Sequence, residues 1–158
     1  NERVGSVKKL LINIHAGNTE RYATVADLFQ FYKINPSGNL LKYASDPMMA
    51  FIYYGEDGNR FGFATKVADT DRTLYELISW EPTLLLDFQP FFFSEIPNQP
   101  FSSFEDRSYR NIDWRFLKLS GQKDFGIAYF IFPARNILVI GTSKASMETV
   151  INRLFGAQ

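Results

Sequence analysis

Two apolar runs near the C-terminal end, followed by a strongly amphipathic stretch, constrain the fold of this chain most. Residues 125–132 are almost continuously apolar, Pro133 opens a turn, and residues 137–141 are apolar again. Apolar runs separated by turn residues are typical of paired buried strands. Ser143 can then cap a helix, because the apolar side chains after it follow the spacing i, i+3, i+4, i+7 of one helix face. These side chains are Met147, Val150, Ile151 and Leu154.

An earlier part of the chain follows the same plan. Residues 48–54 and 61–67 are two apolar segments around a turn rich in glycine and acidic residues, which predicts a β-hairpin. Asp69 or Thr70 can cap the helix that follows, and Pro82 either ends that helix or opens a short continuation. The apolar side chains of this predicted helix are Leu74, Leu77 and Ile78.

The two similar segments predict an α+β fold in a single domain of 158 residues. We expect a first ββα module over residues 46–90, a connection over residues 91–103, and a second module over residues 104–158. The second module adds strands over residues 104–109 and 114–119. An antiparallel sheet covered by helices on one face would bury both apolar stripes, and the repeated plan suggests an internal duplication.

Residues 1–45 are predicted to be a helical lead-in. Ser6 can cap a first helix with the apolar side chains Val7, Leu10, Leu11 and Ile14. Asn18 or Thr19 can cap a second helix, which Pro36 would stop and whose apolar face is Tyr22, Val25, Ala26 and Phe29. A short third helical turn is predicted near Leu40.

Composition excludes several classes of function. Seventeen basic residues balance seventeen acidic ones at a pI near 6.8, so no bulk positive field favours nucleic acid. The chain has no cysteine and one histidine, His15, which excludes disulfides, thiolate metal sites and cysteine nucleophiles. Since His15 follows the first predicted helix, the favoured interpretation is a polar residue at a helix C-terminus. We therefore expect no catalytic residue, no metal site and no cofactor.

Carboxylates are the remaining candidates for chemistry. Asp69, Asp71, Glu105 and Asp106 are the side chains that a carboxylate-dependent, hydrolase-like enzyme could use. Glu56 and Asp57 could join the first two around a hard cation, but their spacing does not match a calcium loop. Helix capping and solvated edge charges are the favoured interpretations of these residues. Arg107, Arg110 and Arg115 lie among acidic and aromatic residues, which favours a cross-strand ladder of mixed charges over a nucleic-acid surface.

An aromatic segment inside the proline-rich connection is the main candidate binding surface. The predicted partner-binding side chains are Phe88, Phe91, Phe92, Phe93, Ile96 and Phe101. An exposed patch of this composition would mark an interface with another protein. A loop folded back over the core would account for the same residues, and both interpretations stay open, with the second favoured.

Several segments carry a resemblance to a known family. They are residues 61–67, 80–83 (Trp-Glu-Pro-Thr), 86–92 (Leu-Asp-Phe-Gln-Pro-Phe-Phe), 104–106, 111–113, Arg115, 137–140 and Thr142 with the final helix. Together they resemble a family of uncharacterised bacterial proteins that is abundant in candidate-phyla lineages such as Parcubacteria. The resemblance covers residues 46–155 and implies a single-pass membrane protein whose soluble domain follows an N-terminal membrane helix. It implies no activity and no catalytic residue.

These observations lead to one expected function with two alternatives. We expect a non-enzymatic interaction or scaffold domain in the cell envelope, outside the cytoplasmic membrane, which binds a protein partner. The chain starts at Asn1 rather than at methionine, so we expect an excised or processed domain that reaches the membrane only through an upstream segment. The alternatives are the carboxylate-dependent enzyme and a structural subunit that self-associates through sheet edges or the aromatic segment.

Overall fold

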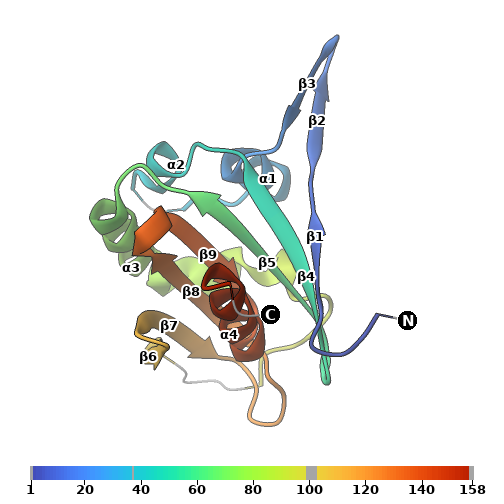
Figure 1. The fold of residues 1–158 in the computed structure, drawn as a ribbon, viewed down its shortest axis with the longest axis vertical. Helices are drawn as coiled ribbons and strands as arrows, with labels where there is room; N and C mark the ends of the chain where they lie inside the picture. The colour runs from blue at the N-terminus through green and yellow to red at the C-terminus, as the bar shows by residue number, and fades with distance from the viewer. Residues whose placement is uncertain (1, 37, 99–102, 157–158) are drawn as a thin grey trace.

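One seven-stranded antiparallel sheet organises the molecule, as the computed structural model shows for residues 2–36, 38–98 and 103–156 (Figure 1). The order of strands across the sheet is β1-β4-β5-β9-β8-β7-β6. Their bounds are β1 Val7–Leu10, β4 Met48–Gly55, β5 Gly58–Lys66, β6 Glu105–Tyr109, β7 Ile112–Lys118, β8 Gly126–Phe132 and β9 Ile137–Gly141. The predicted α+β class with an antiparallel sheet is confirmed.

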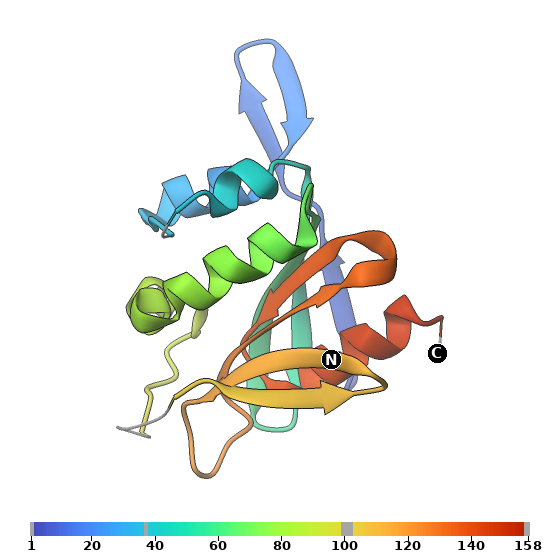
Figure 2. The same ribbon diagram turned by 90° about the vertical axis from the view of Figure 1, so that its left-hand side faces the viewer.

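Helices cover both faces of this sheet, with α1, α2 and α3 on one side and α4 on the other (Figure 2). Their bounds are α1 Val25–Tyr32, α2 Leu40–Tyr43, α3 Thr70–Asp87 and α4 Lys144–Leu154, with short 3-10 turns η1 Gln89–Phe91 and η2 Pro133–Arg135. The prediction of helices on one face is therefore wrong. The reason is visible in β8, where Tyr129 packs on the α3 face and Phe130 on the α4 face. A strand that is apolar on both faces needs cover on both.

Each face has its own hydrophobic core. On the α3 face, Leu77, Trp80 and Leu84 are buried in one cluster with Phe29 of α1 and Phe63 of β5. On the α4 face, the buried cluster is smaller, and its members include Met147, Ile151, Phe51, Trp114 and Phe130. The sheet thus separates two packed layers of side chains, and the two tryptophans lie on opposite sides of it.

The suggested internal duplication is not confirmed. In the centre of the sheet β5 pairs antiparallel with β9, so a two-fold axis perpendicular to the sheet would be needed to exchange the two hairpins. Such an axis would leave both following helices on the same face. Because α3 and α4 lie on opposite faces, the shared hairpin-helix plan is not a two-fold repeat.

The first predicted helix is wrong, because its residues form strands. β1 pairs with the outer edge of β4, with Val7 opposite Tyr53 and Leu10 opposite Ala50. Ser6 caps nothing: its hydroxyl is buried without a hydrogen-bond partner among the described residues. The unpaired edge of β4 offers a ladder of backbone hydrogen bonds, and that tertiary pairing overrides the helical spacing of the apolar side chains.

A small hairpin follows β1 and projects beyond the main sheet (Figures 1 and 2). It consists of β2, Asn13–Ala16, and β3, Thr19–Tyr22, joined by a two-residue turn at Gly17 and Asn18. The predicted helix cap at Asn18 or Thr19 is therefore wrong. The helix begins later, after Thr24, whose hydroxyl accepts from the backbone of Asp27 in a capping box.

The other predicted helix boundaries agree well with the structure. Asp69 caps α3 by accepting from the backbone N–H of Arg72 at 2.9 Å, and α3 continues through Pro82. Ser143 caps α4 by accepting from the backbone N–H of Ser146 at 3.2 Å. The short helical turn expected near residue 40 is α2.

Candidate functional site

A groove of about 370 Å³ opens between α3 and the neighbouring strands β7 and β8, on the α3 face of the sheet. Leu74 and Ile78 of α3 line it and are 41% and 47% exposed, and Ile131 and Pro133 line its opposite side. We call this feature the α3 groove. Exposed apolar side chains gathered in a concave surface are typical of binding sites.

One stripe of α3 forms the helical wall of this groove. Asp71, Leu74, Ile78 and Glu81 are separated by three, four and three residues, which places them along one helix face. The neighbouring stripe, with Leu77 and Trp80, is fully buried in the core. The sequence predicts one apolar face that contains Leu74, Leu77 and Ile78, whereas the structure divides it between core and groove.

An ion pair closes one end of the wall and ties α3 to the sheet. Arg115 of β7 donates through Nε to Glu81 Oε1 at 2.8 Å and through Nη2 to Glu81 Oε2 at 2.7 Å. The Tyr129 hydroxyl donates to the same Oε1 at 2.6 Å. Arg115 Nη1 also donates to Asp106 Oδ1 of the neighbouring strand β6 at 3.0 Å. A two-point contact of this kind fixes the orientation of both side chains.

This polar cluster shifts the acid-base behaviour of its members. The hydrogen bond to Glu81, more than any other contact, raises the pKa of Arg115 above its ordinary value. Burial raises the pKa of Tyr129, and the hydrogen bond to Glu81 raises it further. Arg115 therefore stays charged and Tyr129 stays neutral over the whole physiological pH range. This behaviour is typical of a cluster that stabilises the structure rather than of a pair that transfers protons.

The carboxylates that the alternative, enzymatic interpretation would use divide between two roles. Asp71 and Asp106 line the α3 groove. Asp69 caps α3, and Glu105 accepts from Arg107 at 2.9 Å, so these two are occupied with local structure. Glu56 and Asp57 lie at the β4–β5 turn, separated from Asp69 and Asp71 at the start of α3 by the nine-residue strand β5, which is about 27 Å long. Within the described residues, no group of three His, Asp or Glu side chains could hold a metal ion.

His15 lies in the projecting hairpin and not at a helix end. Its Nε2 is 3.9 Å from Glu20 Oε1, across the hairpin, and both side chains are mostly exposed. The interpretation of His15 as a residue at a helix C-terminus is therefore wrong, because the helix does not exist.

A chain of touching aromatic rings runs from α1 to the segment after η1. Tyr32 contacts Phe91 with ring centroids 5.0 Å apart, Phe91 stacks on Phe61 at 4.7 Å, and Phe61 meets Phe93 at 6.3 Å. Phe31 joins this chain through Tyr32 at 4.9 Å. We call these five residues the aromatic strip. Phe91 and Phe61 are buried, whereas Tyr32 is 40% exposed, Phe93 is 48% exposed and Phe31 is 78% exposed.

The structure divides the six predicted partner-binding residues. Phe88, Phe91 and Phe92 are buried in the core of the α3 face, as expected for a segment folded back on the core. Phe93 and Ile96 are exposed. Phe101 lies outside the described residues. That these side chains bind a partner stays a prediction.

Sequence reasoning misses Phe31 and Tyr32 as members of this surface. Phe31 lies two positions after Phe29, off the buried face of α1, and a large aromatic side chain in that position is a signal that the sequence contains. The spacing places Tyr32 on the buried face, but its position next to Lys33, which ends α1 in a left-handed conformation with φ of 58°, leaves it partly exposed.

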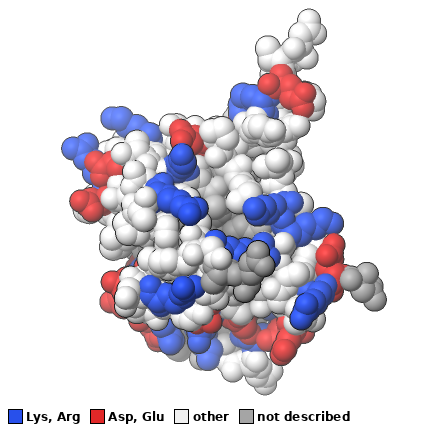
Figure 3. Space-filling model, in the orientation of Figure 1, with Lys and Arg blue, Asp and Glu red and all other residues white. Residues whose placement is uncertain are grey.

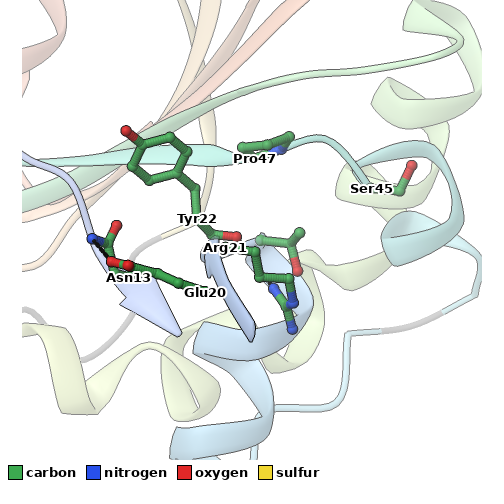
Figure 4. Close-up of a pocket in the computed structure, with 7 residues that line it drawn as sticks. Asn13, Glu20, Arg21, Tyr22, Ser45 and Pro47 are labelled. Carbon is green, nitrogen blue, oxygen red and sulfur yellow. Dashed lines mark hydrogen bonds between the residues drawn. The ribbon is translucent and has the colours of Figure 1, made fainter. Parts of the chain in front are cut away.

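A second, wider hollow of about 740 Å³ lies at the base of the projecting hairpin (Figure 4). Arg21 donates to both carboxylate oxygens of Asp27 at 2.6 and 2.7 Å, and this contact holds the pKa of Asp27 well below its ordinary value. Figure 4 shows Asn13 beside Glu20, to which it donates at 2.7 Å. Asn13, Glu20 and Arg21, which line the hollow, are therefore already engaged in side-chain hydrogen bonds.

The arginines of the β6–β7 hairpin are all held by neighbours. Arg107 pairs with Glu105, Arg115 pairs with Asp106 directly opposite in the sheet, and Arg110 donates to Asn152 at 3.0 Å and lies over the ring of Phe155. These contacts fit the cross-strand ladder that the sequence favours. Basic and acidic side chains are also mixed on the face shown in Figure 3.

Comparisons with family models, with curated proteins and with solved structures found no match to this chain. Among the helices of the described residues, none has both the length and the apolar character needed to span a bilayer.

Proposed function

We propose that this protein is a non-enzymatic interaction domain that binds a protein partner through the exposed rings of the aromatic strip. The observation that supports this proposal is the continuity of the strip: the exposed Phe31 and Phe93 are joined by ring contacts through Tyr32, Phe91 and Phe61. Exposed rings that contact a packed row of rings, of which Phe91 and Phe61 are buried, are held in place before binding, so little side-chain entropy is lost on association.

Phe93 supports the proposal in a second way. It has a left-handed backbone conformation with φ of 50°, which is unfavourable for a bulky side chain. The following residue, Ser94, also has a positive φ, of 69°. Strained backbone of this kind is often found at binding sites. Aromatic side chains are also the residues that most often dominate the energy of protein interfaces.

The location of this domain is part of the same proposal. The resemblance of residues 46–155 to single-pass bacterial membrane proteins supports a place in the cell envelope, outside the cytoplasmic membrane. We propose that the domain is held there by a membrane segment encoded before Asn1. Fractionation of cells that express the full gene product, with protease added to intact spheroplasts, tests this: protection of the domain from protease would contradict it.

Site-specific crosslinking in the native cell tests the role of the strip. A photoreactive phenylalanine analogue is placed at position 31, and, in a second variant, at position 75. Tyr75 is an exposed aromatic residue of α3 outside the strip and serves as the matched control. We expect a crosslinked protein of defined mass from position 31 only. An excess of unlabelled wild-type domain should abolish this crosslink, whereas the double variant Phe31→Ser/Phe93→Ser should not.

Two results would contradict the proposal. Equal crosslinks from positions 31 and 75, or equal competition by the double variant and the wild type, would mean that the strip is not the contact surface. A crosslinked species with twice the mass of the domain would support the self-associating subunit instead. Thermal unfolding of the double variant controls for folding, and we expect its midpoint to stay close to that of the wild type because both rings are exposed.

A further inference from the structure

The α3 groove combines an apolar lining with charged side chains that are mostly negative. Its apolar side chains, Leu74, Ile78 and Ile131, come from both walls. The charged side chains that line it within the described residues are three carboxylates and one guanidinium. These are Asp71, Asp106, Asp113 and Arg115.

The guanidinium does not offset the negative charge of the groove. Arg115 is already bound by both oxygens of Glu81 and by Asp106, so its charge is shared between two carboxylates. The other arginines of this hairpin are engaged elsewhere, since Arg107 pairs with Glu105 and Arg110 lies over Phe155 on the opposite face. Asp106 is 91% exposed at its side chain, and Asp71 and Asp113 are also accessible to solvent. The groove therefore presents net negative charge next to an exposed apolar surface.

We propose that the α3 groove binds a basic, partly apolar segment of another protein, in which an aliphatic side chain is flanked by lysine or arginine. The aliphatic side chain would lie between Leu74, Ile78 and Ile131, and the flanking cations would face Asp71, Asp106 and Asp113. Charge complementarity selects this occupant, because an acidic peptide or a nucleic acid would be repelled by the carboxylates. The inference concerns residues other than the aromatic strip and goes beyond the proposed function.

The dimensions of the groove agree with a short segment. Asp71 and Ile78 are separated by seven residues of helix, or about 10 Å along the axis. An extended peptide covers that distance with about three residues, because it advances about 3.3 Å per residue. A short contact of this kind gives weak binding, with charge attraction that weakens as salt is added.

Fluorescence anisotropy with defined peptides tests the proposal. The probe is a fluorescein-labelled peptide of alternating lysine and leucine, and the comparison peptides alternate lysine with serine and glutamate with leucine. We expect saturable binding of the lysine–leucine peptide, with binding of each comparison peptide about fivefold or more weaker. The variant Asp106→Asn/Asp113→Asn should weaken binding of the lysine–leucine peptide by a similar factor, and so should Leu74→Ser. Circular dichroism and the thermal midpoint of each variant control for folding.

Matched variants separate this proposal from the proposed function. Glu56→Gln removes an exposed carboxylate at the distant β4–β5 turn and should leave peptide binding unchanged, as should Phe31→Ser/Phe93→Ser. Equal losses from Glu56→Gln and from the groove variants would overturn the proposal by showing a general charge effect. Equal binding of the lysine–serine peptide, or of spermidine in competition, would overturn it by showing that a cation alone is sufficient.

Discussion

Trp80 donates its indole N–H to Asp87 Oδ2 at 2.7 Å, across seven residues of α3. Pro82 lies between them, and because proline has no N–H it cannot donate to the carbonyl one turn earlier in the helix. The side-chain hydrogen bond links the turns on either side of this interruption, and Trp80 is fully buried. Both residues belong to the segments on which the family resemblance rests, which gives that part of the pattern a structural role.

Replacing Asp87 by alanine should destabilise the protein by about 1 to 3 kcal/mol, because the indole N–H of Trp80 would be buried without an acceptor. Asp87→Asn keeps an acceptor oxygen and should cost clearly less. Urea unfolding followed by tryptophan fluorescence measures both. If alanine and asparagine have the same effect, the charge of Asp87 matters and the hydrogen bond does not.

The ion pair between Glu81 and Arg115 should show strong coupling. Arg115→Met leaves a half-buried carboxylate without its cation and should destabilise the protein by on the order of 3 kcal/mol. The double variant Glu81→Met/Arg115→Met should cost less than the sum of the single variants, since no unpaired charge remains. Unfolding free energies of all four proteins give the coupling, and strict additivity would show that the pair is not a stabilising unit.

The N-terminal segment shows why part of this fold could not be predicted. Val7, Leu10 and Ile14 have helical spacing, yet Val7 and Leu10 form β1 because β4, more than 30 residues later, offers them its edge, and Ile14 lies in β2, which pairs with β3. The spacing of apolar side chains indicates only the local conformational preference of a segment, whereas strand pairing depends on residues that are distant in the sequence. Where local signals and tertiary packing agree, as for α4 with Ser143 and Met147, the prediction is accurate.

The candidate sites show the same limit. The aromatic segment is recognisable in the sequence, but which of its rings are buried depends on contacts such as Phe91 with Phe61, from a strand 30 residues earlier. The α3 groove could not be predicted, because Leu74 and Asp113 belong to elements that are far apart in the sequence and lie side by side only in the folded protein. Asp71 and Asp106 are candidate functional carboxylates in the sequence, and in the structure both line the α3 groove.

Tyr129 should make stability depend on pH in the alkaline range. Burial and Glu81 raise its pKa above the ordinary value of 10.0, so the folded protein keeps a proton that the unfolded chain releases. The free energy of unfolding is therefore unaffected by this group below about pH 10 and falls above it, by up to about 1.4 kcal/mol per pH unit.

Urea unfolding between pH 8 and pH 11, which brackets the ordinary tyrosine pKa of about 10, measures this dependence. Tyr129→Phe should be less stable at neutral pH but should lose stability less steeply as the pH rises. Burial also raises the pKa of Tyr53. The alkaline slope of Tyr53→Phe is therefore compared with that of Tyr129→Phe, so that the contributions of the two tyrosines are separated. Identical alkaline slopes for the wild type and Tyr129→Phe would rule out a shifted Tyr129.

Gly38 should not tolerate a side chain. Its φ is 66°, and a β-carbon there would overlap the carboxylate of Glu76, which is buried in α3. Gly38→Ala should therefore cost about 2 to 4 kcal/mol, the sum of left-handed strain and steric overlap. Gly156 is the matched control, since its φ is 75° but a β-carbon on it would meet no described atom within 4 Å. Gly156→Ala should cost only the strain, about 1 kcal/mol.

The overlap can be separated from the strain in a Glu76→Ala background. There the shortened side chain leaves room, so adding Gly38→Ala should cost about 1 kcal/mol, as at position 156. Equilibrium unfolding of the single and double variants gives the difference. If Gly38→Ala costs the same with and without the Glu76 carboxylate, steric overlap is not what requires glycine at this position, and left-handed backbone conformation alone accounts for it.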